Sequence, residues 1–240
     1  MCGRFTIKTG LEDLLEAFPF LEAPSEDDVA EVLAPRYNAA PTQPVPAARD
    51  STGARIESLR WGLVPFFAKD LAIGSRMINA RSETVAEKPS FREPFRRRRC
   101  LVLADGFYEW RKEPDGKTKT PIHLRLRGGR PFAFAGLWDR WRPKGPEADR
   151  DTPEVLSCTI LTTEPNELVS PIHDRMPVML VDETSARRWL DPKAAPAELH
   201  ELLGPVPADA MESWAVSTIV NSPRNETPRC IERGGQATLF

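Results

Sequence analysis

Prolines occur along the whole chain, and they restrict its fold more than any other feature of the sequence. The 240 residues include 24 prolines, and these are not gathered in one tract. Each proline removes a backbone N–H donor and fixes φ. The segment RYNAAPTQPVPAAR at 36–49 is the clearest case, because its three prolines predict an extended or turning backbone. The sequence therefore predicts turns, short strands and fixed loops rather than one disordered tract.

Apolar runs predict many strands and few helices. Strands are expected at 55–63, 100–110, 122–127, 131–138, 155–163, 178–181 and 214–220. The pair Gly128-Gly129 predicts a hairpin that joins 122–127 to 131–138. Helices are expected at 9–18, 184–190 and 197–203, the first with Thr9 as its N-cap and Glu12 completing a capping box. Because strands and helices do not alternate, the predicted fold is α+β: a curled, mostly antiparallel sheet or barrel-like core with a few peripheral helices.

One domain is expected to span residues 1–240. The polar segment 142–153 has strands on both sides, so it is predicted to be a surface loop rather than a boundary, and the polar residues 224–240 are predicted to form a loose tail. The four cysteines are far apart and form no C-x-x-C pair, which indicates free thiols. With only three histidines and no ligand spacing, we expect no metal site and no other cofactor.

The net charge of −2 gives no general affinity for nucleic acid, so any such binding requires a local basic cleft. The first ten residues, MCGRFTIKTG, lack the apolar segment of a signal peptide, and no stretch approaches the length of a membrane span. The sequence therefore predicts an intracellular protein with no membrane partner, and its small size favours a monomer.

Cys2 stands in a position with unusual chemistry. It follows Met1 directly, and small second residues generally permit removal of the initiator methionine. The mature chain would then carry an α-amine and a thiol on adjacent carbons. An α-amine has a pKa near ~7.7–8, so its neutral form can attack an aldehyde to give an imine. The thiol can then close a five-membered thiazolidine ring, unless the position of Cys2 is an accident of sequence.

Three further segments contain candidate site residues. In INARSE, Asn79 can aim a fixed amide at a reacting group and Arg81 can bind a phosphate, although a loop with local Asn hydrogen bonds is the alternative. In DGFYEW, Glu109 is either an edge-strand residue facing water or a general acid or base with a raised pKa, and Trp110 either stacks on a base or packs in the core. His173 lies in a proline-bracketed loop beside charged residues, which favours a site over a structural role.

Together these segments resemble one family, the SRAP domain (SOS response-associated peptidase; abasic site processing proteins). The motifs that carry the resemblance are, in chain order, MCGRF, RYNAAPTQPVP, RWGLVPFF, INARSET, CLVLADGFYEW, AGLWDRW, LTTEPN and IHDRMPVML, with a weaker match at WAVSTIVNSP. Each motif alone is weak evidence. Their presence in this order makes the resemblance specific, and it covers nearly the whole chain to about residue 181.

The resemblance implies an activity in the DNA damage response. Members of the family trap abasic sites in single-stranded DNA through a thiazolidine at the N-terminal cysteine. Cys2 would be the nucleophile, and Asn79 would orient the N-terminal residue and the opened sugar. Glu109 would act as the acid and base in ring opening and imine formation, and His173 would shuttle protons and stabilise the sugar hydroxyl or phosphate. The imine intermediate also implies abasic-site lyase activity.

The resemblance also implies a DNA-binding surface. Phe66 and Phe67 lie where members carry aromatics that wedge against bases, although many members have Trp-Trp there, which affects the strength of stacking. The residues expected to contact the strand are Arg4, Arg81, Phe66, Phe67, Trp110 and Thr162. The basic run at 96–99 is expected to be a solvated edge or a peripheral DNA contact.

Two other functions compete with abasic-site trapping. A cysteine-type peptidase or autopeptidase would use Cys2 as the nucleophile and His173 as its base. A non-enzymatic module would read modified bases or single strands through its aromatic and basic groups, but it gives no reason for a cysteine at position two.

Overall fold

The structure of the protein is a computed structural model that describes residues 2–49, 53–143 and 153–234. Its strands are β1 (Phe5–Ile7), β2 (Leu21–Glu22), β3 (Arg36–Ala39), β4 (Pro44–Arg49), β5 (Ala54–Trp61), β6 (Asn79–Arg81), β7 (Arg99–Ala104), β8 (Gly106–Lys112), β9 (Lys119–Leu126), β10 (Phe132–Trp141), β11 (Val155–Thr163), β12 (Met176–Pro177), β13 (Met179–Leu180) and β14 (Met211–Ala215). The α-helices are α1 (Leu11–Ala17), α2 (Val29–Val32), α3 (Pro89–Arg97), α4 (Glu183–Leu190) and α5 (Pro196–Glu201). Short 3-10 turns are η1 (Leu71–Arg76), η2 (Arg127–Gly129), η3 (Ala208–Ala210), η4 (Thr218–Asn221) and η5 (Pro228–Cys230).

Five strands close into a barrel. The strands β11, β10, β7, β4 and β5 pair in that order, and β5 returns to β11. The closing pair is parallel, with Ser157 opposite Arg60 and Cys158 opposite Trp61, whereas the other four pairs are antiparallel. The predicted α+β fold with a barrel-like, mostly antiparallel core is therefore confirmed.

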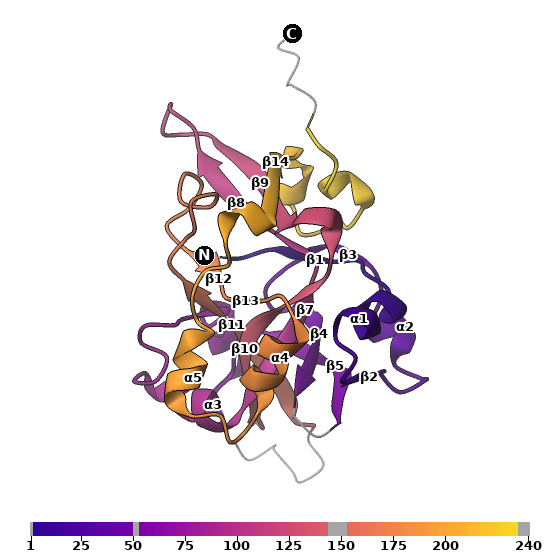
Figure 1. The fold of residues 1–240 in the computed structure, drawn as a ribbon, viewed down its shortest axis with the longest axis vertical. Helices are drawn as coiled ribbons and strands as arrows, with labels where there is room; N and C mark the ends of the chain where they lie inside the picture. The colour runs from indigo at the N-terminus through magenta and orange to yellow at the C-terminus, as the bar shows by residue number, and fades with distance from the viewer. Residues whose placement is uncertain (1, 50–52, 144–152, 235–240) are drawn as a thin grey trace.

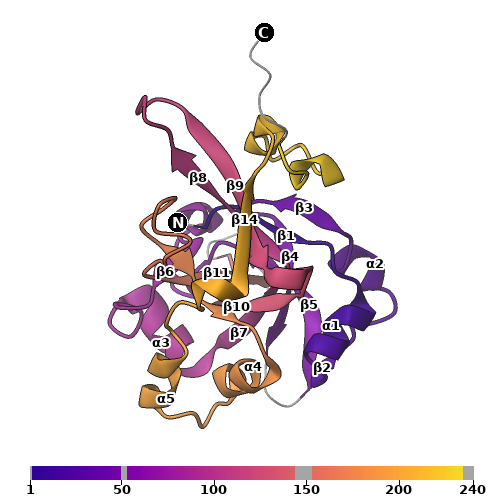
Figure 2. The same ribbon diagram turned by 45° about the horizontal axis from the view of Figure 1, so that its top comes forward.

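A second sheet lies over one end of the barrel, with the antiparallel order β14-β9-β8-β1-β3 (Figure 1). Figure 2 shows β8 and β9 projecting from the body as a long hairpin. This arrangement contradicts the hairpin predicted at 128–129, because β9 pairs with β8 and β14, whereas β10 pairs with β7 and β11 in the barrel. Gly128 and Gly129 do have φ of 76° and 72°, but they turn the chain from one sheet to the other.

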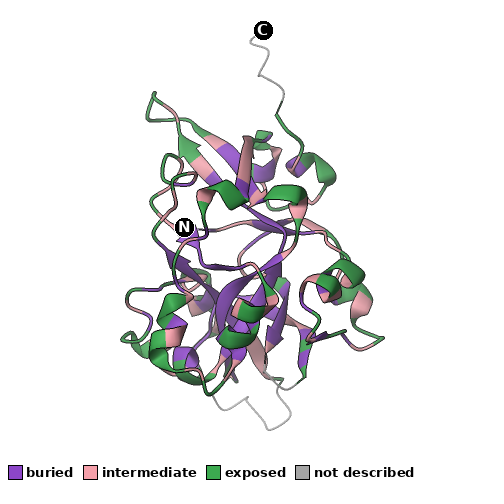
Figure 3. Ribbon diagram, in the orientation of Figure 1, coloured by how far each residue is buried: buried purple, intermediate pink, exposed green. Residues whose placement is uncertain are grey.

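The core fills the barrel, as the buried ribbon in Figure 3 shows. Every residue of β7 is buried, since one face of the strand lines the barrel interior and α3 and α4 cover the outside. A continuous apolar run, CLVLA, is what a strand covered on both faces requires. All four cysteines are free and buried, which confirms the predicted free thiols. In the described part of the chain, no helix combines the length and apolar character that a membrane span needs.

The helices and strands differ from the predictions at three places. The first helix begins after Gly10 with no side-chain cap, because Thr9 donates from its N and Oγ1 to Asp105 Oδ2, each at 2.9 Å, instead of capping the helix. Helix α3 was not expected, since Pro94 lies inside it and proline in a helix interior removes a hydrogen bond. The last strand ends at Ala215 rather than residue 220, and η4 follows.

The residues expected to form a loose tail are packed as far as residue 234. Glu226 accepts hydrogen bonds from the backbone N–H of Tyr37 and, at 2.6 Å, from that of Asn38, and it also pairs with Arg36. The Cys230 side chain is buried against this region. The tail prediction is therefore wrong for 224–234. Residues 235–240 and most of the predicted loop at 142–153 lie outside the described residues.

Arg99 is the basic residue with the largest expected effect on stability. It is buried, and its guanidinium donates to the carbonyls of Phe95, Arg96, Trp189 and Asp191 at 2.6–2.9 Å. An Arg99→Ala substitution should lower the free energy of unfolding by about 3 kcal/mol, because it leaves buried carbonyls without donors. Urea unfolding measures this. The exposed residue Arg97 provides the matched control, because Arg97→Ala should change the free energy of unfolding by less than ~0.5 kcal/mol. Equal effects of the two substitutions would contradict the structural role of Arg99.

Candidate active site

Cys2 lies just before β1, and its side chain is fully buried. Its Sγ is 3.7 Å from the carbonyl oxygen of Arg4, to which the thiol donates. Burial raises the pKa of the thiol well above its usual range, and the nearby charge of Glu109 raises it further. Cys2 is therefore a protonated thiol at neutral pH, and its use as a nucleophile requires a neighbouring group that accepts the proton.

Asn79 fixes the backbone of Cys2. It is the first residue of β6, which pairs in parallel with β11 so that Asn79 lies opposite Ile160. From this position its Nδ2 donates to the carbonyl oxygen of Cys2 at 2.7 Å. The side chain of Trp61 supports the same segment by donating from Nε1 to the carbonyl of Ile78 at 2.9 Å. Strand β6, paired to the barrel strand β11, thus holds the amide against the N-terminal segment.

Glu109 is a buried acid at the same place. Strand β8 lies between β1 and β9, so Glu109 is only 2% exposed and does not face water from a sheet edge. Burial raises its pKa to about 7, as the apolar surroundings in the sequence predicted. At neutral pH the carboxyl group is present in both its protonated and ionised forms, which suits a group that both donates and accepts protons.

His173 completes the cluster from the loop before β12. Its Nε2 lies 4.0 Å from Glu109 Oε2, while its Nδ1 lies 2.8 Å from Asp174 Oδ1 and accepts a 3.0 Å hydrogen bond from the N–H of Arg175. Burial lowers the pKa of the imidazole, so it is mostly neutral at pH 7. The four residues predicted to act in catalysis therefore meet at one place, although they come from four separate segments of the chain.

A buried carboxylate that the sequence did not mark as functional fixes the strand after Cys2. Asp105 accepts hydrogen bonds from Thr6 Oγ1 at 2.6 Å, from the N–H of Lys8 at 2.7 Å and from Thr9. Next to it lies His123, whose pKa burial lowers to about 3, so the imidazole is neutral there. These bonds hold β1 in register with β8, with Phe5 opposite Phe107, and so align Cys2 with Glu109. The only sign in the sequence was an Asp-Gly break in an apolar run.

Two of the predicted DNA contacts meet at Asn221. Arg4 is half-buried and donates to Asn38 Oδ1 at 2.7 Å and to the carbonyls of Val220 and Asn221 at 2.8 and 3.2 Å. These bonds occupy three of the five N–H donors of a guanidinium, so two at most can serve a phosphate. The indole of Trp110 donates to Asn221 Oδ1 at 2.8 Å. The segment after β14 thereby orients both side chains beside the cluster.

Phe66 and Phe67 are the large apolar side chains most exposed in the described structure, at 56% and 45%. Their rings meet edge to face, with centroids 5.3 Å apart. The loop that carries them is anchored where Gly62, at φ 128°, passes Gly74 so closely that a Cβ on either would lie within 2.6 Å of the other's carbonyl oxygen. This rigid presentation suits the predicted stacking on bases.

The remaining predicted contacts differ in exposure. Arg81 is exposed at the end of β6. Thr162 is fully buried, with its Oγ1 3.5 Å from the carbonyl of Ala80, so its predicted contact with DNA does not fit this conformation. In the basic run at 96–99, Arg98 pairs with Asp139 and Arg99 is buried, so only the first two arginines form the expected solvated edge.

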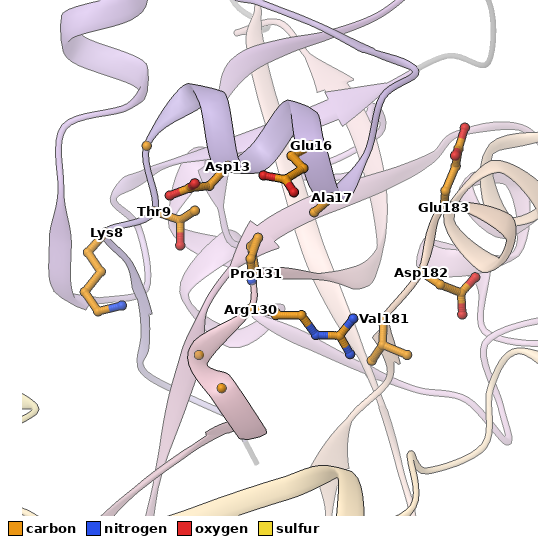
Figure 4. A pocket seen from close by; sticks show the side chains of 13 residues that line it. Lys8, Thr9, Asp13, Glu16, Ala17, Arg130, Pro131, Val181, Asp182 and Glu183 are labelled. Atoms are coloured by element: carbon orange, nitrogen blue, oxygen red, sulfur yellow. The ribbon is translucent and has the colours of Figure 1, made fainter.

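A separate cavity of about 720 Å³ lies between α1, the turn before β10 and the start of α4 (Figure 4). Its lining is mixed in charge and includes Lys8 and Arg130 as well as Asp13, Glu16, Asp182 and Glu183. None of the residues in the cluster around Cys2 lines it. Among the described residues, no group of three His, Cys, Asp or Glu side chains is placed to hold a metal ion.

Comparisons with known proteins give the family of this chain. The family described as SOS response associated peptidase (SRAP) matches residues 1–223. The abasic site processing protein YoqW of Bacillus subtilis (strain 168) is 46% identical over 237 residues, which cover 97% of this chain and 99% of that protein. The abasic site processing protein HMCES of Gallus gallus is 33% identical over 267 residues, covering 96% of this chain and 77% of that protein. A crystal structure of a protein from Bacteroides thetaiotaomicron superposes with a TM-score of 0.83 at 26% identity, covering 97% of this chain and 100% of that one. The chain therefore belongs to the SOS response associated peptidase (SRAP) family.

Proposed function

We propose that this protein traps abasic sites in single-stranded DNA by forming a thiazolidine at Cys2 after Met1 is removed. The observation that carries the proposal is the convergence of Asn79, Glu109 and His173 around the second residue of the chain. A buried acid with a pKa of about 7 beside an N-terminal cysteine suits aldehyde chemistry. The relatives named as abasic site processing proteins agree with this substrate.

The reaction balances without a cofactor. With Met1 in place the nitrogen of Cys2 is an amide, so removal of Met1 is required to create the amine. The neutral amine attacks the aldehyde carbon of the opened deoxyribose, and loss of one water gives the imine. The Cys2 thiol then adds its sulfur to the imine carbon, and its proton ends on the nitrogen. The product is a five-membered ring and a DNA–protein cross-link that weighs the sum of the two chains less one water.

The cluster supplies the proton transfers that these steps need. In its protonated form Glu109 donates to the sugar ring oxygen and to the departing water, and in its ionised form it accepts the proton of the buried thiol. Asn79 keeps the carbonyl of Cys2 in place while the amine and thiol react. His173, which faces Glu109 and is mostly neutral, relays protons and stabilises the sugar hydroxyl.

The geometry favours trapping over the two competing functions. A cysteine peptidase needs a thiolate, whereas burial raises the pKa of the Cys2 thiol and His173 Nε2 is directed toward Glu109. A plain binding module has no use for a buried acid with a shifted pKa next to Cys2. It would bind intact and abasic strands equally, and it would not form a covalent product.

The proposal is tested by mixing the processed protein with a single-stranded oligonucleotide that carries one abasic site. A denaturing gel should show a heat-stable adduct, and its intact mass should equal protein plus DNA less one water. An oligonucleotide without the lesion is the control and should give no adduct. Robust hydrolysis of unrelated peptides without any adduct would support the peptidase instead.

Asn79 gives a second prediction. An Asn79→Ala substitution should slow adduct formation about fivefold, because it removes one positioning hydrogen bond worth ~1 kcal/mol, and it should leave DNA affinity unchanged. The matched variant Asn79→Asp keeps the shape but offers no donor to the carbonyl of Cys2 at neutral pH. Both variants should be slow in single-turnover kinetics. A normal rate for Asn79→Asp would show that the hydrogen bond has no role.

A further inference from the structure

The β8–β9 hairpin carries an excess of positive charge next to the site. Residues 111–119 have the sequence RKEPDGKTK, which contains four cations and two anions, so this segment has a net charge of +2 in a chain whose net charge is −2. The remainder of the chain therefore has a net charge of −4. All four cationic side chains are exposed, and Figure 2 shows the hairpin standing away from the rest of the molecule. The basic charge that the whole chain lacks is thus concentrated in one projecting element.

The two acids of the hairpin are already engaged within it. Glu113 pairs with Arg111 at 3.1 Å, which removes one cation and one anion from the balance. Asp115 accepts from the N–H groups of Lys117 and Thr118, each at 2.8 Å, and these bonds hold the turn at the tip. The hairpin therefore presents its three lysines without a carboxylate partner: within the described residues no ion pair of Lys112, Lys117 or Lys119 is found.

Lys112 and Lys119 face one another across the ladder. They are directly opposite in the antiparallel pairing of β8 and β9. Like charges in this position are destabilising, and proteins usually relieve them with an opposite charge. Here the pair stays uncompensated at the last position of the ladder before the turn. An anionic ligand between the two lysines would relieve that repulsion.

The pair also lies within reach of the reacting centre. Lys112 is three residues along β8 from Glu109, which is about 10 Å at the rise of a strand, and because side chains alternate along a strand Lys112 shares its face with Trp110 rather than with Glu109. On the other strand, the charge of Lys119 adds to burial in lowering the pKa of His173, which places that charge on the side of the site. Trp110 lies between Glu109 and Lys112 on the same strand. A DNA strand that leaves the lesion at Glu109 and continues past Trp110 would bring its flanking phosphates to these lysines.

We propose that the β8–β9 hairpin is a phosphate-binding arm that holds the DNA strand flanking the lesion, with Lys112 and Lys119 as its principal contacts. The proposal rests on the proposed function for the identity of the lesion. Its own content is separate, because phosphate contacts add affinity and salt dependence but carry no information about bases or damage. Lys117, nearer the tip, extends the same arm.

The test compares Lys112→Ala/Lys119→Ala with a matched control, Lys88→Ala/Lys193→Ala. The control lysines are equally exposed and lie beside α3 and α4, at the end of the molecule away from the hairpin. The probe is a single-stranded oligonucleotide of about 16 nucleotides, the upper range for single-strand binding sites, carrying a non-reactive abasic analogue. Binding is measured from low to high salt, and thermal melting verifies that each variant is folded.

Loss of two phosphate contacts should make the negative slope of log K against log salt shallower by about 1.4. The affinity lost by the hairpin variant relative to the wild type should therefore be roughly 25-fold greater at 0.1 M salt than at 1 M salt. The control should match the wild type. The same loss is expected with an undamaged strand, because phosphate contacts carry no information about damage. An unchanged slope in the hairpin variant would overturn the proposal.

The arm and the trapping chemistry can fail separately. At saturating reactive oligonucleotide, the hairpin variant should form the covalent adduct within about twofold of the wild-type rate. If the wild type forms no adduct but the hairpin variant still loses salt-dependent binding, the proposed function is wrong and the phosphate-binding arm is supported. If the wild type forms adducts normally and the salt slope of the hairpin variant equals that of the wild type, the phosphate-binding arm is wrong and the proposed function is supported.

Discussion

Replacing Cys2 by alanine is expected to abolish the heat-stable adduct while leaving the imine chemistry intact. Alanine is small enough to permit removal of Met1, so the variant still begins with an α-amine. That amine can form an imine with the abasic aldehyde, but no thiol is present to close the ring. The imine can then either hydrolyse or undergo β-elimination. Denaturing gels should therefore show strand cleavage and no lasting cross-link.

Borohydride reduction separates the two steps. Added during the reaction, it should convert the imine of Cys2→Ala into a permanent amine linkage to the strand. The Cys2→Ser variant should likewise form a reversible imine without a permanent adduct, since it keeps the amine and lacks the thiol. A wild-type sample whose N-terminus is blocked is the control and should give neither species. Absence of any trapped imine in Cys2→Ala would contradict the role of the α-amine as the nucleophile.

Replacing Glu109 by glutamine is expected to slow adduct formation by about 10²–10⁴-fold, the usual contribution of a general acid or base. Burial raises the pKa of Glu109 to about 7, so its protonated form is lost as the pH rises above that value. The α-amine has a pKa near ~7.7–8, so it becomes protonated and stops acting as a nucleophile as the pH falls below that value. The wild-type rate should therefore rise and then fall with pH, with a maximum between about 7 and 8.

The pH profile distinguishes a proton donor from a structural residue. In Glu109→Gln the falling limb at high pH should disappear, so that the residual rate increases and then levels off as the amine becomes neutral. The exposed residue Glu87 provides a control, since Glu87→Gln should keep both the rate and the bell shape. Single-turnover kinetics at saturating DNA measure these rates. A bell-shaped profile that survives in Glu109→Gln would assign the acid step to another group.

The sequence predicted a barrel strand and the acidic character of the site for physical reasons. Strand β11 was expected at the residues where it is found, because an apolar run with turn signals on both sides is what a buried strand requires. The rise in the pKa of Glu109 could also be predicted, since the flanking aromatic residues indicated an apolar site. The convergence of Asn79, Glu109 and His173 at Cys2 could be expected only from the family resemblance, because no local pattern reports contacts between distant segments.

The errors share one cause: long-range partners replaced local ones. Thr9 was expected to cap the first helix, but its hydrogen bonds go to Asp105, almost a hundred residues away. Two glycines that suit a hairpin turn instead pass the chain between two sheets. Arg99 was expected in a solvated basic run, but it is buried against four backbone carbonyls. None of these partners can be identified from neighbouring residues.

The most direct test of the trapping proposal is the position of the covalent bond. The adduct formed on single-stranded DNA would be digested with nuclease and with trypsin, which cuts after Arg4, and the peptides would be analysed by mass spectrometry. The proposal predicts the fragment Cys2-Gly3-Arg4 carrying the sugar remnant, with no thiol left for alkylation. A remnant on a lysine, or on an N-terminal peptide whose thiol still alkylates, would contradict the thiazolidine at Cys2.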